Sequence, residues 1–213
     1  DGIRDVERSR GLGDVYKRQD DEPAFDPGQI YIEKTLQTSG NIPEDALNAD
    51  KIKGYFTDNT GKRFPLRANT EYIIVHTAGS NVSFEQVRAF HLSKGWRDIG
   101  YNVYIERDGA VKIGRGGNTD AVGAHAIGYN FNSVGISYSG CSNWERNQSL
   151  STAVNNGTIT KNELRSLIEQ IKKLQIKYKI PANKVLGHNE TDSNKACPCL
   201  NMNELRKQLI ANP

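Results

Sequence analysis

Three residues that can do chemistry lie close together near the C-terminal end of the chain. His188, Lys195 and Cys197 fall within residues 187–197, a stretch with almost no apolar side chains. Such a stretch cannot hold a core together, so we expect a surface loop that carries a site on a scaffold formed elsewhere. A short apolar run precedes His188, which places it where a strand meets this loop. Lys195 and Cys197 are two residues apart and would point to the same side of an extended chain.

An imidazole and a thiolate are suitable ligands for Zn²⁺, but two ligands do not complete a site. A third histidine, His76, ends the apolar run 72–75, which has the composition of a buried strand and would point its last side chain into a cleft. The residues therefore predict a Zn²⁺ site made by His76, His188 and Cys197, with water as the fourth ligand. Three protein ligands and an open position are typical of catalytic zinc. The alternative is two ordinary histidines and a buried thiol.

The composition narrows the class of protein. At 213 residues the chain suits one domain with a self-supporting core. No apolar run approaches the roughly 20 residues of a membrane span. A net charge of +3 does not indicate nucleic acid and only weakly suits an anionic polymer such as a cell wall. Three cysteines cannot all pair with one another, so at least one is a thiol or a metal ligand. We expect a monomer.

The N-terminal third is expected to lie outside the main domain. Residues 1–19 are charged and lack the apolar stretch of a signal peptide, and we expect a non-native or disordered leader with the true start missing. Residues 20–69 are polar and rich in proline. They predict an N-terminal extension that lies over the main domain, with a short hairpin around 57–62. Residues 70–213 would then form the main domain.

Predicted strands alternate with predicted helices along the main domain. The strands are expected at 71–76, 101–107, 110–113, 134–138 and 185–187. The helices are expected at about 83–94, 160–180 and 203–210, and the first two begin with the capping-box residues Ser83 and Thr160. Residues 139–157 are expected to be irregular. This alternation predicts an α/β fold in which a mixed central β-sheet is flanked by helices.

A series of short motifs follows one another in a recognisable order. The motifs are Ile73-Ile74-Val75-His76, Lys94-Gly95-Trp96-Arg97-Asp98-Ile99-Gly100-Tyr101-Asn102, Arg107-Asp108-Gly109, Gly123-Ala124-His125-Ala126, Tyr129-Asn130, Ser133-Val134-Gly135-Ile136, Gly187-His188 and Lys195-Ala196-Cys197-Pro198. In this order they resemble the zinc N-acetylmuramoyl-L-alanine amidases of the bacteriophage-lysozyme and peptidoglycan-recognition-protein type. The resemblance covers roughly residues 71–212.

The resemblance implies an activity and gives roles to residues. It implies hydrolysis of the amide between the muramic-acid lactyl group and the L-alanine of the peptidoglycan stem, by an endolysin or a wall-remodelling enzyme acting on the bacterial cell wall. It implies that His76, His188 and Cys197 bind Zn²⁺, which would activate water and polarise the scissile carbonyl. Tyr101 and Lys195 stand at the family's two catalytic positions. Lys195 would stabilise the oxyanion, and Tyr101 would position the water or donate a hydrogen bond.

Other residues have weaker assignments. His125 and Asn102 are expected to bind substrate, His125 because its loop lies between glycines and could line the groove. His91 and Trp96 are expected to be core residues. Cys141 is expected to be a small buried side chain, and a Cys141–Cys199 bridge is left open.

The sequence departs from the family pattern at three places. Ser137 stands where some relatives carry a catalytic glutamate, so Tyr101 would carry more of the role. Asn189-Glu190 replaces the commoner Arg-Asp or Arg-Glu after the second histidine, which would change the hydrogen bonds behind the ligands. Cys199 replaces a glycine, and we expect an alternative metal ligand or a thiol prone to oxidation.

Two other functions compete with the enzyme. One is a recognition module that holds the muropeptide without cutting it. Such modules typically lose the cysteine ligand, and the presence of Cys197, Tyr101 and Lys195 favours the enzyme. The other is a regulatory role through protein contacts of the N-terminal extension.

Overall fold

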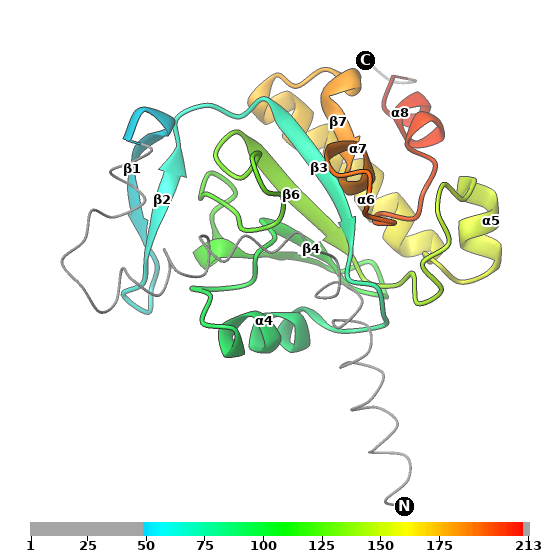
Figure 1. The fold of residues 1–213 in the computed structure, drawn as a ribbon, viewed down its shortest axis with the longest axis horizontal. Helices are drawn as coiled ribbons and strands as arrows, with labels where there is room; N and C mark the ends of the chain where they lie inside the picture. Colours follow the sequence, from blue (N-terminus) through cyan, green and yellow to red (C-terminus); the bar gives the residue numbers. More distant parts are fainter. Residues whose placement is uncertain (1–48, 211–213) are drawn as a thin grey trace, which may run out of the picture.

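A five-stranded mixed β-sheet forms the centre of the structure, a computed structural model that describes residues 49–210 (Figure 1). The strands lie in the order β5 (Val111–Ile113), β4 (Val103–Ile105), β6 (Ser133–Tyr138), β3 (Tyr72–Thr77) and β7 (Val185–Gly187). Strand β3 is parallel to both of its neighbours, and only the β4–β5 pair is antiparallel among the strands of this sheet. Helices flank the sheet, which confirms the predicted fold class.

The predicted helices are present and lie on opposite sides of the sheet. Helix α6 (Lys161–Tyr178) and helix α8 (Met202–Ile210) share one apolar cluster with the sheet, whereas α4 (Phe84–Ser93) belongs to a second cluster. Both predicted capping boxes form, at Ser83 and at Thr160. The described residues also form two short α-helices, α5 (Leu150–Asn155) and α7 (His188–Thr191).

The alternation of side chains along β3 gives the sheet two different faces. Ile73 and Val75 point to the cluster with α6, where Leu167 is fully buried. Truncating such a leucine to alanine typically costs about 2–5 kcal/mol. His76 must point the opposite way, because successive side chains of a strand alternate. Ser137 is its register partner on β6. One face of the sheet is therefore apolar and the other carries polar groups.

Strand β4 is shorter than predicted, and the difference changes the position of Tyr101. The chain bends at Asn102, and Tyr101 does not continue the alternation of Val103 and Ile105. Instead its ring packs near Tyr104 in the α4 cluster, with ring centroids 6.5 Å apart. The bend therefore turns Tyr101 towards the face that carries His76.

Two elements lie where an irregular stretch or a loop was expected. Helix α5 falls within residues 139–157, and Ser149 caps it by accepting a hydrogen bond from the Thr152 N–H. Ser149 could have predicted the start of this helix, because serine is a preferred N-cap residue. Helix α7 begins directly at His188, within the predicted loop.

The described part of the predicted extension is a hairpin attached to the domain. A 3₁₀ turn (Ala49–Lys51) leads into β1 (Ile52–Thr57), which pairs with β2 (Arg63–Arg67) across the turn expected at 57–62. Phe64 is fully buried and the Arg67 guanidinium donates to the Ala121 and Thr119 carbonyls. The predicted leader 1–19 and residues 20–48 lie outside the described residues. Within the described residues, no helix has both the length and the hydrophobicity to cross a bilayer.

Candidate metal centre

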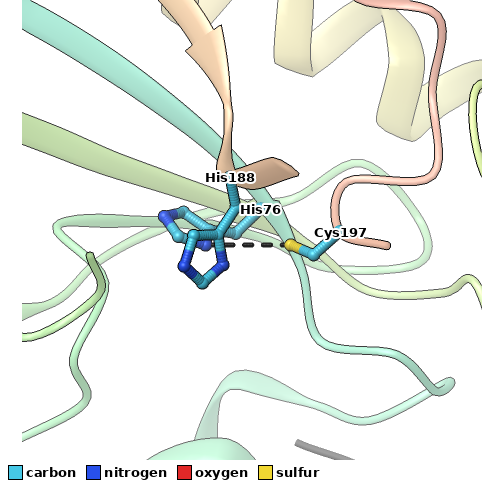
Figure 2. A group of neighbouring side chains, drawn as sticks. All are labelled: His76, His188 and Cys197. Atoms are coloured by element: carbon cyan, nitrogen blue, oxygen red, sulfur yellow. Dashed lines mark hydrogen bonds between the residues drawn. The ribbon is translucent and has the colours of Figure 1, made fainter. Parts of the chain in front are cut away.

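The three predicted metal ligands meet at one point, although they come from distant parts of the chain (Figure 2). One ligand atom from each of His76, His188 and Cys197 lies within 4.8 Å of the other two. The His76 Nδ1 atom is 3.8 Å from the Cys197 Sγ atom. The rings of His76 and His188 lie 4.5 Å apart between centroids.

Neighbouring parallel strands bring the two histidines together. Val75 pairs with Gly187 across β3 and β7, so the residues that follow, His76 and His188, lie side by side at the ends of these strands. The third ligand is held against the same edge. The Thr77 N–H donates to Cys197 Sγ at 3.2 Å, and the Asn189 N–H donates to the Cys197 carbonyl at 2.8 Å.

A series of hydrogen bonds behind His76 determines which of its ring nitrogens is unprotonated. The Ser133 hydroxyl donates to the Tyr129 carbonyl at 2.7 Å, so its oxygen can accept from His125 Nε2, which lies 3.4 Å away. A proton on His125 Nε2 leaves His125 Nδ1 as an acceptor, and this atom is 3.0 Å from His76 Nε2. The proton of His76 therefore sits on Nε2, and Nδ1 offers its lone pair towards Cys197.

Two glycines make the room that His125 needs. A Cβ atom added at Gly123 or at Gly135 would come within 2.5 Å of the His125 ring. The Asn130 side chain accepts from the backbone N–H groups of His125 and Ala126, at 2.8 and 3.0 Å. These contacts place His125 behind His76, in a supporting position that the sequence did not indicate. In the sequence, the motif Gly123-Ala124-His125 together with Gly135 could have indicated that this histidine is closely packed.

Burial keeps the imidazoles of the centre neutral. Burial, then the nearby His188 and His125, hold the pKa of His76 well below its usual value. Burial, followed by the charge of Lys195, lowers the pKa of His188 to about 4. Burial and then His188 likewise lower the pKa of His125. Neutral imidazole is the form that binds a metal, so these rings are ready to coordinate near neutral pH.

The donor set and its spacing fit a zinc ion. Zinc bonds of about 2.0–2.1 Å to nitrogen and 2.3 Å to sulfur in a tetrahedron separate neighbouring donors by roughly 3.4–3.6 Å. The 3.8 Å between His76 Nδ1 and Cys197 Sγ is close to this separation. Two imidazoles and one thiol would leave one tetrahedral position for water or substrate.

The two predicted catalytic side chains lie beside these ligands. The Tyr101 ring centroid is 5.2 Å from that of His76, and Tyr101 is 8% exposed. Lys195 is half-buried, and its charge acts on the neighbouring His188. The centre thus combines a candidate metal-binding triad with a phenol and an ammonium group.

Asn102 does not lie where a substrate contact would require it. Its side chain is fully buried and is held at both ends by backbone groups. The amide nitrogen donates to the Ala121 carbonyl at 2.8 Å, and the amide oxygen accepts from the Gly135 N–H at 3.0 Å. The side chain therefore fixes the bend before β4, and its position does not support the predicted substrate-binding role.

His91 is a buried core residue, as expected, whereas Trp96 is only half-buried and stacks against it. Their ring centroids are 4.4 Å apart with an interplanar angle of 22°. His91 is 6% exposed, and its Nδ1 accepts a hydrogen bond from the Gly100 N–H at 3.1 Å. The imidazole of His91 thus supports the chain just before Tyr101.

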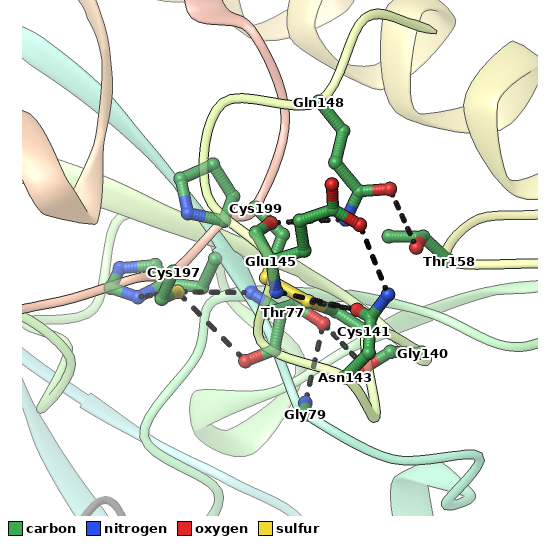
Figure 3. Close-up of a disulfide and its surroundings, with 12 residues drawn as sticks. Thr77, Gly79, Gly140, Cys141, Asn143, Glu145, Gln148, Thr158, Cys197 and Cys199 are labelled. Atoms are coloured by element: carbon green, nitrogen blue, oxygen red, sulfur yellow. Dashed lines mark hydrogen bonds between the residues drawn. A yellow bond between two sulfur atoms is a disulfide. The ribbon is translucent and has the colours of Figure 1, made fainter. Parts of the chain in front are cut away.

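Cys141 and Cys199 form a disulfide, which is the bridge that the sequence left open, and the expectation of a free Cys199 was wrong (Figure 3). Cys199 is therefore neither an alternative ligand nor an additional thiol beside the centre, and Cys141 is not merely a small apolar side chain. Cys197 is the cysteine outside this bond. The sequence showed that at least one cysteine must stay unpaired, but the pairing required the fold to bring the loops after β6 and α7 together.

Glu190 and Arg206 form a support that sequence reasoning did not identify. Arg206 holds both carboxylate oxygens of Glu190, at 2.8 and 3.0 Å, and also donates to the Val185 carbonyl at 3.0 Å. Glu190 in turn accepts from the Gly187 N–H at 2.8 Å. This paired arrangement fixes the backbone on either side of His188.

Known proteins match both the sequence and the fold. The family model described as N-acetylmuramoyl-L-alanine amidase matches residues 66–199. The endolysin of Enterobacteria phage T3 is 45% identical over 78 residues, which is 35% of this chain and 50% of that protein. The chain thus matches about half the length of that relative. Peptidoglycan-recognition protein SC1a/b of Drosophila simulans is 42% identical over 106 residues, covering 41% of this chain and 56% of that protein.

A solved structure extends the likeness to three dimensions. The N-acetylmuramoyl-L-alanine amidase LysC from Clostridium intestinale superposes with a TM-score of 0.54 at 28% identity, over 66% of this chain and 85% of that one. The family match begins inside β2 and ends two residues after Cys197, so it includes all three predicted ligands. The chain belongs to the N-acetylmuramoyl-L-alanine amidase family.

Proposed function

We propose that this protein is a zinc-dependent hydrolase that cuts the amide between N-acetylmuramic acid and the L-alanine of the peptidoglycan stem. The observation that carries the proposal is the meeting of His76, His188 and Cys197 within 4.8 Å in a chain of this family. Two neutral imidazoles, a cysteine that can bind as its thiolate and a fourth open position are a donor set suited to catalytic zinc. The match to a phage endolysin is consistent with action on the cell wall.

The side chains around the centre suit amide hydrolysis. A bound zinc ion would act as a Lewis acid that polarises the carbonyl and lowers the pKa of water. The Lys195 ammonium group would stabilise the negative charge that develops on the carbonyl oxygen, a contribution that is typically about 3 kcal/mol. The Tyr101 hydroxyl would orient the attacking water or donate to the same oxygen. His125 would hold His76 in the tautomer that turns Nδ1 to the metal.

Digestion of purified peptidoglycan tests the reaction directly. The zinc-loaded protein is expected to release stem peptides with a free L-alanine amine and to leave glycan strands with free lactyl carboxyl groups, both visible by mass spectrometry. Cys197→Ser, prepared in the same way, is the matched control and should release neither. Release of disaccharides, or of peptides cut within the stem, would contradict the proposal.

The likeness to a peptidoglycan-recognition protein supports a second candidate, a module that binds the muropeptide without cutting it. The two functions differ in what happens to bound wall. A binding module would sediment with peptidoglycan and retain zinc, yet release no stem peptide over prolonged incubation. The retention of Cys197, Lys195 and Tyr101 around one point favours the enzyme.

A further inference from the structure

A loop on the far side of Cys197 from the histidines holds the segment that carries both Lys195 and Cys197. This loop, residues Cys141–Gln148, joins β6 to α5 and is called the strap here. It contacts residues 193–201 at its beginning, at its middle and at its end. None of the strap's residues belongs to the metal-binding triad.

Arg146, in the middle of the strap, holds the backbone directly before Lys195. Its guanidinium group donates to two successive carbonyls, that of Ser193 at 3.0 Å and that of Asn194 at 2.9 Å. The fork of an arginine is suited to two parallel acceptors, which fixes direction as well as position. A local hydrogen bond, from the Lys195 N–H to the Asp192 carbonyl at 3.1 Å, closes the turn at the same point.

Both ends of the strap are anchored, so Arg146 does not hang from a loose loop (Figure 3). Cys141, at the beginning, is bonded to Cys199. At the end, the Gln148 N–H donates to the Cys199 carbonyl at 2.8 Å, and the Gln148 carbonyl accepts from Asn201 at 2.7 Å. The Gln148 side chain is buried and accepts from Asn156 at 2.7 Å.

The beginning of the strap is also tied to the metal-binding edge of the sheet. The Thr77 hydroxyl donates to the Gly140 carbonyl, next to Cys141, at 2.8 Å. The backbone N–H of the same Thr77 donates to Cys197 Sγ. One residue of β3 therefore connects the base of the strap to the predicted sulfur ligand.

We propose that Arg146 is a positioning residue for the amidase reaction, which acts by holding the backbone that orients Lys195 while the disulfide anchors the strap. The proposal rests on the proposed function of Lys195. A lysine side chain is long and flexible, so its ammonium group can stabilise a developing charge only if the backbone below it is held in place. The two hydrogen bonds of Arg146 go to the Ser193 and Asn194 carbonyls rather than to the ligands, so its effect on turnover would pass through Lys195.

A double-mutant cycle tests this route. Arg146→Ala is expected to lower kcat on a soluble muropeptide roughly tenfold, with KM changed less than about twofold and zinc content unchanged. In a Lys195→Ala background, the same substitution should have no further effect. Arg146→Lys should recover part of the loss, because one ammonium group can replace one of the two donors. Arg165→Ala, at another exposed arginine that bonds a neighbouring side chain, is the matched control and should leave kcat unchanged.

Equal losses from Arg146→Ala in the wild-type and Lys195→Ala backgrounds would overturn the proposal, and so would an unchanged kcat. A second measurement does not depend on activity. Hydrogen exchange at the backbone amides of residues 193–197 should be faster in Arg146→Ala than in the wild type and unaffected in Arg165→Ala. If the wild-type protein cuts no peptidoglycan, the proposed function is wrong. The exchange measurement still tests the role of Arg146 in that case, because unchanged exchange in Arg146→Ala would show that Arg146 does not hold this backbone.

Discussion

The Nε2 atom of His76 lies 3.0 Å from the Nδ1 atom of His125, and this contact fixes the tautomer of the predicted ligand. The Ser133 hydroxyl and the Tyr129 carbonyl set the direction of the hydrogen bonds from the far end. His76 therefore presents a bare Nδ1 towards Cys197 before any metal arrives. Preset orientation of this kind reduces what must be reorganised when a metal binds.

Removing the nitrogen atoms of His125 should weaken metal binding without removing a ligand. We expect His125→Phe, which keeps a ring in the space left by Gly123 and Gly135, to lower zinc affinity roughly 10–100-fold. Competition with a chelator of known affinity measures this. Ser133→Ala should act in the same direction but less strongly, because it removes only the more distant partner. Unchanged affinity in His125→Phe would mean that the neighbouring packing alone orients His76.

Loss of the sulfur ligand should remove both the metal and the activity. Cys197→Ser replaces a thiolate with a hydroxyl that does not ionise near neutral pH, so zinc content measured by atomic absorption should fall towards zero. Because Cys199 is occupied in a disulfide, it cannot take over as a ligand. Full zinc occupancy in this variant would contradict the assignment of the triad.

Substitution of the two catalytic candidates should separate turnover from metal binding. Lys195→Ala is expected to lower kcat about 100-fold, which corresponds to the roughly 3 kcal/mol of one charge-stabilising donor. Tyr101→Phe keeps the ring that packs near His76 and should lower kcat about tenfold. Both variants should retain one zinc ion per chain. A variant with unchanged kcat would show that its side chain packs beside the centre without taking part.

Removing the Cys141–Cys199 disulfide should destabilise the fold. The bond joins residues separated by 58 positions, and closing a loop of this size typically contributes about 2–4 kcal/mol. We expect the Cys141→Ser, Cys199→Ser double variant to lose this much free energy of unfolding in urea. Dithiothreitol should lower the stability of the wild type to that of the double variant and leave the double variant unchanged. Equal stability with and without the reductant would contradict the prediction.

Acid should destabilise the protein in part through His91. Burial, with a smaller effect of Arg115, lowers the pKa of His91 to about 3, whereas an unfolded chain would have about 6.5. The neutral ring is favoured in the fold, so its stabilising effect is complete above pH 6.5 and is lost as the pH falls towards 3. In this window His91 alone should contribute a slope of about 1.4 kcal/mol per pH unit, in addition to the other buried histidines. Urea unfolding of the metal-free protein at several pH values measures it.

A variant without a titrating group is the control for this pH dependence. The amide oxygen of His91→Gln can still accept from the Gly100 N–H but cannot take up a proton near pH 5. Its free energy of unfolding should therefore vary less steeply below pH 6.5 than that of the wild type. Parallel curves for the two proteins would show that His91 does not contribute.

Local signals in the sequence were sufficient for most of the secondary structure. The capping boxes at Ser83 and Thr160 predicted two helices at the correct starts, because the bonds they make involve residues only three positions apart. Strand β3 was clear because residues 72–75 form an unbroken apolar run. The bend at Asn102 was not predicted, since it depends on Ala121 and Gly135, which lie far along the chain.

In the candidate site, too, single residues were predictable from the sequence, whereas contacts between residues far apart in the chain were not. The three candidate ligands were identifiable because histidine and cysteine are uncommon residues with few other uses at such positions, and the order of motifs supported them. The residues that hold these candidates in place were not identifiable. The contact between His76 and His125, the Glu190–Arg206 pair and the disulfide all join residues that only the fold brings together.

The disulfide also determines which cysteine of the chain is available to bind a metal. Among the possible pairings of three cysteines, only that of Cys141 with Cys199 leaves Cys197 able to bind a metal. Either of the other pairings would consume the ligand and block the centre. A chain with all three cysteines reduced would also keep Cys197 available, so the choice of disulfide partner, rather than oxidation itself, decides whether the candidate centre keeps its sulfur ligand.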